Sequence, residues 1–238
     1  MPDPTIIIDP YSEGAHNAGG SSKRVLRQGF YRDNSTVCVI PTLGSIPSRV
    51  VQTWWNLMAP MNGVFIRVFV NHMEVGNAYS TAIEQILAHP QLAACKFILT
   101  LEHDNMPPSD GLINLLAAAN EHPEFSAIGG LYWTKGEGGQ PMIYGNPHEI
   151  PFNFRPQPPN PPHLVECNGL GMGFTLFRTK LFMDERIERP WFRTVQQNGM
   201  SYTQDLHFFE RARGAGHRFA CHCGVGVGHY DPVTDLVW

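Results

Sequence analysis

Apolar residues in the first half of this chain gather in short runs, and amphipathic segments separate the runs. The runs predict strands over residues 36–41, 64–71, 96–101 and 127–133. Apolar positions at helical spacing between them predict helices over residues 47–58, 77–88 and 109–119. Strands that are apolar on both faces and alternate with helices are typical of a parallel sheet covered by helices on each side. The pattern therefore predicts a Rossmann-like α/β fold with a mostly parallel sheet.

Two segments interrupt this pattern. Residues 1–34 mix Pro, Gly, Ser and charged residues around one apolar patch, so we expect an extended, mobile arm before a folded domain over residues 35–238. Residues 136–162 are crowded with Gly and Pro, which predicts a long extended loop. Such a loop is either a passive surface excursion or a mobile flap over an active site, and the second interpretation takes the flap as residues 136–163.

The second half of the chain predicts fewer regular elements. A glycine-rich apolar run predicts a strand over residues 169–177, in which alternating glycines allow another backbone or a substrate to approach closely. A helix capped by Thr203 follows, and a last strand ends near His229.

Composition narrows the class of protein. With 238 residues, of which 42% are hydrophobic, the chain is long enough for one large domain. A formal charge of -4 provides no overall positive field for nucleic acid, although a local basic groove is still compatible with it. No apolar run approaches the roughly 20 residues that span a bilayer, and the first residues lack a signal-peptide layout, so we expect a cytoplasmic protein.

The cysteines do not favour a zinc site. They are five in number, which is odd, and they are scattered through a chain that needs no disulfides for stability. A cluster of His217, Cys221, His222, Cys223 and His229 has suitable ligand types. Two cysteines at alternate positions of a strand, however, share one face without the turn that zinc knuckles use, so reduced thiols are the simpler interpretation.

The most informative segment is residues 96–108, an apolar strand that runs directly into Glu102, His103 and Asp104. Ligands of open parallel sheets bind beyond the carboxyl ends of the strands. In extended backbone Glu102 and Asp104 point to the same face, where their oxygens could hold Mg²⁺ or Mn²⁺ and so neutralise a diphosphate. The alternative is a solvated turn that begins the next helix.

A second acidic position lies later in the chain. Asp205 falls in the first turn of the predicted helix, where a carboxylate also stabilises the helix dipole without any catalytic role. His229 ends the last strand between Gly228 and Tyr230 and could be an exposed ligand.

Taken in order over residues 36–231, these segments resemble the GT-A glycosyltransferases, especially family 2-like and phage-encoded members. The resemblance rests on six segments: Ile40-Pro-Thr, Leu101-Glu-His-Asp-Asn-Met-Pro-Pro at the place of the family's Asp-x-Asp motif, residues 168–178, Pro190-Trp-Phe, Thr203-Gln-Asp and Gly228-His.

The resemblance implies a role for each matched residue. Asp104 would be the principal ligand of the metal and diphosphate, with Glu102 as the first acid of the motif and His229 completing a Mn²⁺ or Mg²⁺ site. Asp205 would be the catalytic base. The strand-end residues implied for the nucleoside pocket are Pro41, Thr42 and Asn71, and Gly171 and Met172 lie on the strand that matches the acceptor side. Trp133 and Trp191 are candidates for an aromatic acceptor platform, with packing in the core as the alternative. Two positions depart from the family: Glu102 replaces its commoner Asp, and Gln204 replaces the Glu before its catalytic Asp.

The implied function is metal-dependent sugar transfer from a nucleotide-sugar, most simply a UDP-sugar, to a hydroxyl of a glycan, a protein or a modified DNA base. With Asp205 as base the reaction inverts the anomeric centre, and retention is left open. Two alternatives are a catalytically degenerate GT-A domain that binds nucleotide or glycan, and a nucleotidyltransferase. The second lacks a Gly-rich phosphate loop after the first strand, where only Thr42-Leu-Gly-Ser-Ile-Pro-Ser-Arg stands.

Overall fold

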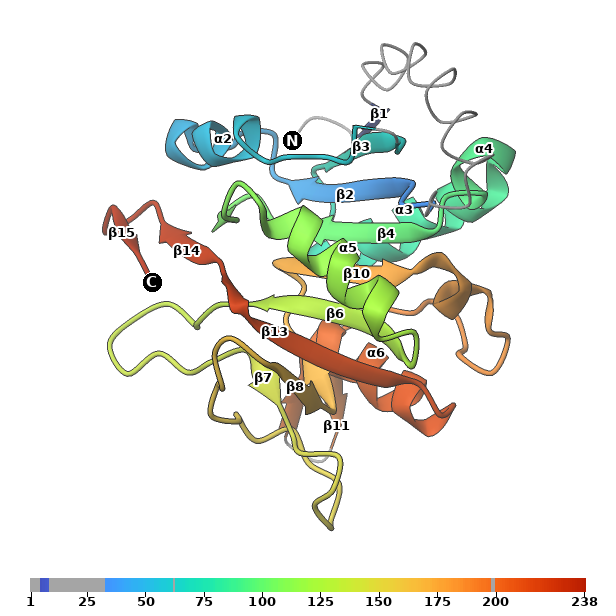
Figure 1. Ribbon diagram of the computed structural model, residues 1–238, viewed down its shortest axis with the longest axis vertical. Helices are drawn as coiled ribbons and strands as arrows, with labels where there is room; N and C mark the ends of the chain where they lie inside the picture. Colours follow the sequence, from blue (N-terminus) through green and yellow to red (C-terminus); the bar gives the residue numbers. More distant parts are fainter. Residues whose placement is uncertain (1–4, 9–32, 62, 198–199) are drawn as a thin grey trace.

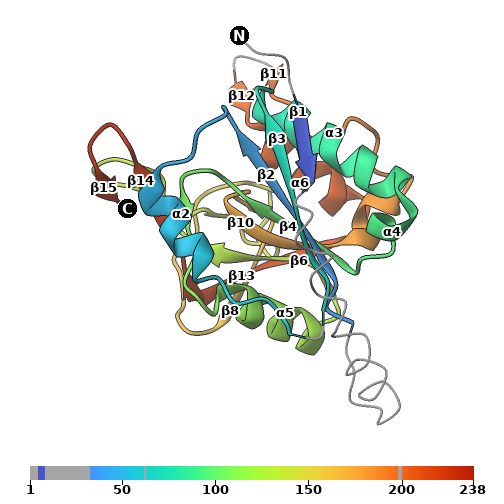
Figure 2. The ribbon, with the colours of Figure 1, turned by 90° about the horizontal axis from the view of Figure 1, so that it is seen from above.

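The protein folds around one large twisted sheet with helices on both faces (Figures 1 and 2). The computed structural model describes residues 5–8, 33–61, 63–197 and 200–238. The sheet has eight strands in the order β1-β3-β2-β4-β10-β6-β13-β8. These strands are β1 (Thr5–Ile8), β2 (Thr36–Thr42), β3 (Phe65–Asn71), β4 (Phe97–Leu101), β6 (Phe125–Leu131), β8 (Leu164–Cys167), β10 (Phe174–Arg178) and β13 (Arg218–Gly226).

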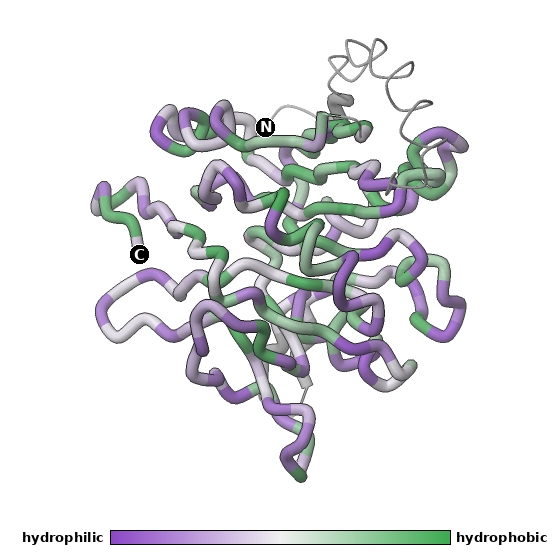
Figure 3. Tube along the Cα trace, in the orientation of Figure 1, coloured by the Kyte–Doolittle hydropathy of each residue, from purple (hydrophilic) through white to green (hydrophobic). Residues whose placement is uncertain are grey.

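The helices follow from the spacing of apolar residues, and each covers one face of the sheet. They are α2 (Ser48–Trp55), α3 (Val75–Ala88), α4 (Pro90–Ala93), α5 (Gly111–Glu121), the short 3₁₀ helix η2 (Thr179–Met183) and α6 (Gln204–Gly214). One core cluster joins the sheet to α3 and α6, and a second joins its other face to α2 and α5. Figure 3 shows the resulting pattern, with hydrophobic residues along the central strands and hydrophilic ones in the loops. No helix in the described part of the chain is long and apolar enough to cross a membrane.

The sheet is mixed, and the prediction of a mostly parallel sheet is therefore right only in part. Strands β3, β2 and β4 are parallel neighbours, as are β6 and β13. Strand β10 lies antiparallel between β4 and β6, and β1 and β8 add antiparallel pairs at the edges. A buried apolar run looks the same in either direction, so the sequence pattern did not reveal the orientation of β10.

Seven further short strands in the described part of the chain form small sheets outside the large one. They are β5 (Asn105–Met106), β7 (Ile143–Tyr144), β9 (Gly169–Leu170), β11 (Val195–Gln197), β12 (Met200–Tyr202), β14 (Gly228–Asp231) and β15 (Leu236–Val237). The predicted strand over 169–177 is thus two strands, because the chain bends at residues 171–173 between β9 and β10. The predicted last strand is likewise divided into β13 and β14.

The segment before residue 35 contains one element in its described part. Strand β1 pairs antiparallel with β3, with Thr5 opposite Asn71, so these residues extend the sheet by one strand. The remainder of the predicted arm, residues 1–4 and 9–32, lies outside the described residues. The division into an arm and a domain over residues 35–238 stays a prediction.

Candidate active site

The carboxyl ends of β3, β2, β4, β6 and β13 all reach the same edge of the sheet, because β10 is antiparallel to both β4 and β6. A pocket of about 320 Å³ opens at this edge. It is lined by Pro41, Thr42, Leu43, Met73, Glu74, Val75, Glu102, His103 and Asp104. Four residues that the sequence assigned to the donor, Pro41, Thr42, Glu102 and Asp104, therefore meet around one pocket. The fifth, Asn71, is the last residue of β3, where it pairs with Thr42 of β2. It therefore lies one strand further from the pocket.

Asp104 is the centre of a small charged group at the edge of this pocket. The Lys135 ammonium lies 2.5 Å from Asp104 Oδ2, and His229 Nε2 lies 3.5 Å from the same oxygen. Burial by itself would raise the pKa of Asp104, but hydrogen bonds from His229 and Lys135 and their charges outweigh it and lower that pKa. Asp104 is therefore a carboxylate at neutral pH.

Backbone pairing brings His229 to this position from the far end of the chain. Strand β14 pairs with β5, with His229 opposite Asn105, and the Tyr230 N–H donates to the Asp104 carbonyl at 2.8 Å. His229 Nδ1 lies 2.7 Å from the Trp133 carbonyl oxygen. Because a carbonyl oxygen only accepts, Nδ1 donates to it, and this hydrogen bond turns Nε2 toward Asp104.

Glu102 has a different environment from Asp104. The Tyr79 hydroxyl donates to Glu102 Oε1 at 3.3 Å. Burial, reinforced by the negative charges of Asp104 and Asp205, raises the pKa of Glu102 from 4.5 to about 8. With a pKa of about 8, Glu102 is mostly protonated at neutral pH.

Asp205 lies at the first turn of α6, as predicted, and is 6% exposed. Its carboxylate accepts hydrogen bonds from the Thr203 hydroxyl and, at 2.9 Å, from the Leu206 N–H. Thr203 holds the N-cap position, but its hydroxyl is used for Asp205 and makes no cap bond to the backbone. Burial raises the pKa of Asp205, which these hydrogen bonds only partly offset.

Asp205 belongs to the same electrostatic group as Glu102. Its charge contributes to the raised pKa of Glu102 and also to those of Tyr132 and Tyr144, in which burial is the larger cause. Next to Asp205, Gln204 packs so closely on Gly76 that a β-carbon there would lie 3.1 Å from Gln204 Cβ. The start of α6 thus adjoins the start of α3, whose first residues line the pocket.

The three metal ligands implied by the sequence do not form one ligand set. In the part of the chain that the structure describes, no group of three or more His, Cys, Asp or Glu side chains could hold a metal ion. Asp104 and His229 are neighbours, but Glu102 is bonded to Tyr79, and Lys135 takes the Asp104 oxygen that faces His229. An acid bonded to a tyrosine and an ammonium beside Asp104 do not fit a divalent cation.

The predicted acceptor residues separate into two groups. Trp133, Gly171 and Met172 lie near the site: the Trp133 carbonyl accepts from His229, and the Met172 carbonyl oxygen lies 3.5 Å from the Tyr79 hydroxyl oxygen. Gly171 allows close contact, since a β-carbon there would overlap the Tyr132 hydroxyl. Trp191 is different. It is 1% exposed and packs edge-on against Phe182, so it is a core residue and offers no surface for an acceptor.

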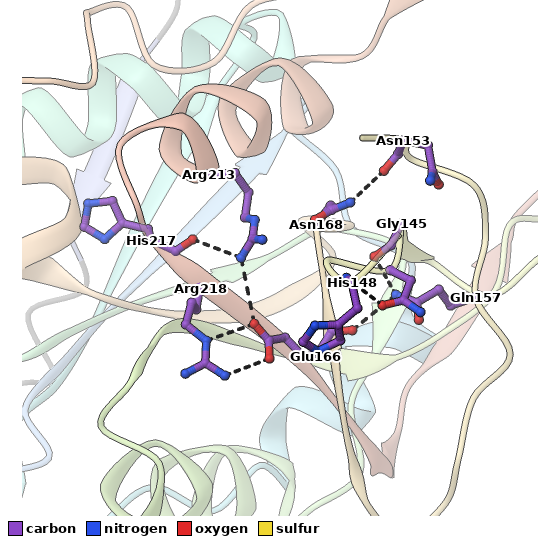
Figure 4. Close-up of polar contacts among 10 residues, drawn as sticks. Gly145, His148, Asn153, Gln157, Glu166, Asn168, Arg213, His217 and Arg218 are labelled. Carbon is purple, nitrogen blue, oxygen red and sulfur yellow. Dashed lines mark hydrogen bonds and ion pairs between the residues drawn. The ribbon is translucent and has the colours of Figure 1, made fainter. Parts of the chain in front are cut away.

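Hydrogen bonds anchor the Pro/Gly-rich loop at several points (Figure 4). Gln157 Nε2 donates to the carbonyls of Gly145 and Glu166 at 2.5 and 3.2 Å. Asn168 Nδ2 donates to the Asn153 carbonyl at 2.9 Å. The loop therefore has fixed points over residues 143–157, which the sequence interpretation of a mobile flap did not foresee.

A second set of contacts in Figure 4 secures the strand beneath the loop. Glu166 on β8 accepts two hydrogen bonds from Arg218 on β13, at 2.9 and 2.7 Å, and lies 3.8 Å from Arg213. The hydrogen bond from Arg218 lowers the pKa of Glu166. These ion pairs hold β8 on β13 and on α6, and β8 in turn carries the Glu166 carbonyl that accepts from Gln157.

Three residues of the site, Tyr79, Tyr132 and Lys135, were not predicted from the sequence. Tyr79 belongs to the apolar pattern of α3, and Tyr132 to the apolar run that predicted a strand over residues 127–133, so neither stands out as a polar site residue. A signal for Lys135 was present: it follows the end of β6, which reaches the same sheet edge as the end of β4. Side chains just beyond two such strands are expected to meet.

No protein-family model matches this chain, and no curated protein matches its sequence. Solved structures do match. The crystal structure of A197 from STIV aligns with a TM-score of 0.59 and 18% sequence identity, over 83% of this chain and 86% of that one. The structure of S. aureus TarS 1-349 aligns with a TM-score of 0.46 and 15% identity, over 79% of this chain and 57% of that one. The A197 alignment confirms the GT-A resemblance at the level of the fold.

Proposed function

We propose that this protein is a glycosyltransferase that moves a sugar from a nucleotide-sugar to an acceptor hydroxyl. One observation carries the proposal: carboxyl groups from two distant segments, Glu102 and Asp104 after β4 and Asp205 on α6, form one electrostatic group beside a pocket at the carboxyl edge of a GT-A-like sheet. Ligand pockets of ~300–1,000 Å³ are usual for small molecules, and this pocket falls within that range.

The proposed donor is a UDP-sugar, with its nucleoside against Pro41 and Thr42 and its diphosphate toward Asp104 and Lys135. Both Pro41 and Thr42 are at the end of β2, where a flat base can lie across the strand. The Thr42 hydroxyl donates to the Ser45 carbonyl at 3.1 Å, which keeps the turn after β2 in place.

Asp205 is the proposed general base. A buried carboxylate with a raised pKa takes up a proton more readily than an exposed one, which suits this task near neutral pH. The acceptor oxygen forms its bond to the anomeric carbon while the bond from that carbon to the diphosphate breaks. The electron pair of the broken bond leaves with the diphosphate, and the acceptor proton goes to Asp205. A single displacement of this kind inverts the anomeric centre.

The proposed acceptor side is formed by the segment between β9 and β10 together with the anchored loop. Phe154 of the loop lies against Gly169, where a β-carbon would be 3.0 Å from its ring. Tyr144 is close enough to Asp205 for the charge of that carboxyl to raise its pKa further. Hydroxyls of a glycan, a protein or a modified DNA base are the proposed acceptors.

The test is a donor screen followed by product analysis. Thermal shift with nucleoside diphosphates and their sugars identifies a ligand, because binding to the native state raises the apparent stability. Release of nucleoside diphosphate and sugar from that donor supports the proposal that the protein is a glycosyltransferase.

Two other results would assign the alternatives instead. Binding without turnover, even with hydroxyl acceptors present, points to a degenerate binding domain. Formation of a nucleotide-sugar from a nucleoside triphosphate and a sugar phosphate points to a nucleotidyltransferase.

A further inference from the structure

Lys135 lies beside the pocket, in contact with Asp104, which is one of the lining residues. Its ammonium lies 2.5 Å from Asp104, and the side chains of the two residues are 30% and 16% exposed. The turn that carries it is closed by backbone hydrogen bonds from Thr134 to Gln140 and from Met142 to Tyr132, both at 2.9 Å. A lysine fixed in this way loses little further freedom when it binds a ligand.

Acidic side chains line the pocket, so a bound diphosphate needs a cationic group beside it. The lining of the pocket includes the carboxyl groups of Glu74 and Asp104. The diphosphate group of an entering nucleotide-sugar brings more negative charge. It gains one further negative charge when its bond to the sugar breaks. An ammonium has three N–H donors, so Lys135 can keep its bond to Asp104 and still offer two donors to phosphate oxygens.

We propose that Lys135, held by Asp104, is the cationic group that binds the donor diphosphate and stabilises it as a leaving group, in the role that the sequence had assigned to a divalent cation. This inference rests on the proposed function. It explains why the ligands implied for a metal do not come together: Lys135 already takes the Asp104 oxygen nearest to His229, and Glu102 is turned to Tyr79.

The experiment measures the affinity for UDP by calorimetry, with EDTA and with Mn²⁺, on the wild type and three variants. Lys135→Met removes the ammonium, and Lys135→Arg keeps a cation. Lys180→Met is the matched control, because Lys180 is exposed and follows β10, which ends at the opposite edge of the sheet. Melting temperatures of all four proteins show whether each variant is folded.

The expected result is that wild type binds UDP in EDTA and that Mn²⁺ changes the affinity by less than about threefold. Lys135→Met should lose about tenfold or more, as when a charge-assisted hydrogen bond is removed, Lys135→Arg should lose less, and Lys180→Met should match wild type.

Two results would overturn the inference alone: UDP binding by wild type that requires Mn²⁺, or a folded Lys135→Met variant that binds UDP in EDTA as well as wild type. If wild type binds none of UDP, ADP, GDP, CDP or dTDP with or without Mn²⁺, the proposed function fails, and the inference fails with it.

Discussion

Replacing Glu102 by Gln should make the protein more stable in alkaline solution and leave its stability almost unchanged in acid. Burial and the charges of Asp104 and Asp205 raise the pKa of Glu102 from 4.5 to about 8 in the folded protein. The folded state therefore holds this proton more tightly than the unfolded chain does. The stabilisation from the bound proton is complete below the unfolded pKa of 4.5, declines as the pH rises, and is lost above about 8.

The size of the effect follows from the same values. At about 1.4 kcal/mol for each tenfold change in proton affinity, the span from 4.5 to about 8 corresponds to an upper value of about 5 kcal/mol. Between about pH 6 and pH 9 the wild type loses about 2–3 kcal/mol of the stabilisation that the proton on Glu102 provides. The amide that replaces the carboxyl in Glu102→Gln is neutral at every pH and has nearly the shape of the protonated acid, so the variant should escape this loss.

The assay is denaturant unfolding of wild type and Glu102→Gln at about pH 6 and pH 9, where the difference in their free energies of unfolding should grow by about 2–3 kcal/mol. In thermal unfolding this corresponds to roughly 5–10 °C for a chain of this size. Glu84→Gln is the matched control, because Glu84 is exposed on α3, the helix that carries Tyr79. Equal pH dependence of wild type and Glu102→Gln would show that Glu102 is ionised and solvated, and would refute the reasoning.

Three further predictions address the base, the bend and the loop. Asp205→Asn should slow sugar transfer by about 10²–10⁴-fold with donor affinity unchanged, measured by steady-state kinetics and calorimetry; near-normal turnover with a slightly lower melting temperature would leave Asp205 as a helix-stabilising residue only. Gly173→Ala should destabilise the protein by about 1–3 kcal/mol in urea unfolding, because the new β-carbon would overlap the buried Asn105 side chain, and unchanged stability would contradict this packing. Hydrogen exchange should be slow at the amides of Gly145 and Gln157, which donate to the Arg155 and Ile143 carbonyls, even without ligand, and fast exchange there would favour the mobile flap.

The sequence by itself determined most of the fold and the main acids of the site. The predicted elements over 36–133 appear with their ends shifted by a few residues, because apolar periodicity and the residues that begin and end helices are local properties. The apolar strand that runs into Glu102 and Asp104 was enough to predict both acids beyond the carboxyl end of a strand, where the structure has them lining a pocket. Asp205 was located by the same kind of local signal, a polar cap followed by an amphipathic helix.

The tertiary structure alone decided which of these residues act on one another. The sequence places Lys135 just after a predicted strand, but the contact of its ammonium with Asp104 depends on β4 and β6 reaching one edge with β10 inserted antiparallel between them. The burial of Trp191 and the raised pKa of Glu102 likewise come from side chains that are distant in the chain. Burial and charge are properties of the packed neighbourhood, and a linear pattern shows which residues are available but not which of them lie together.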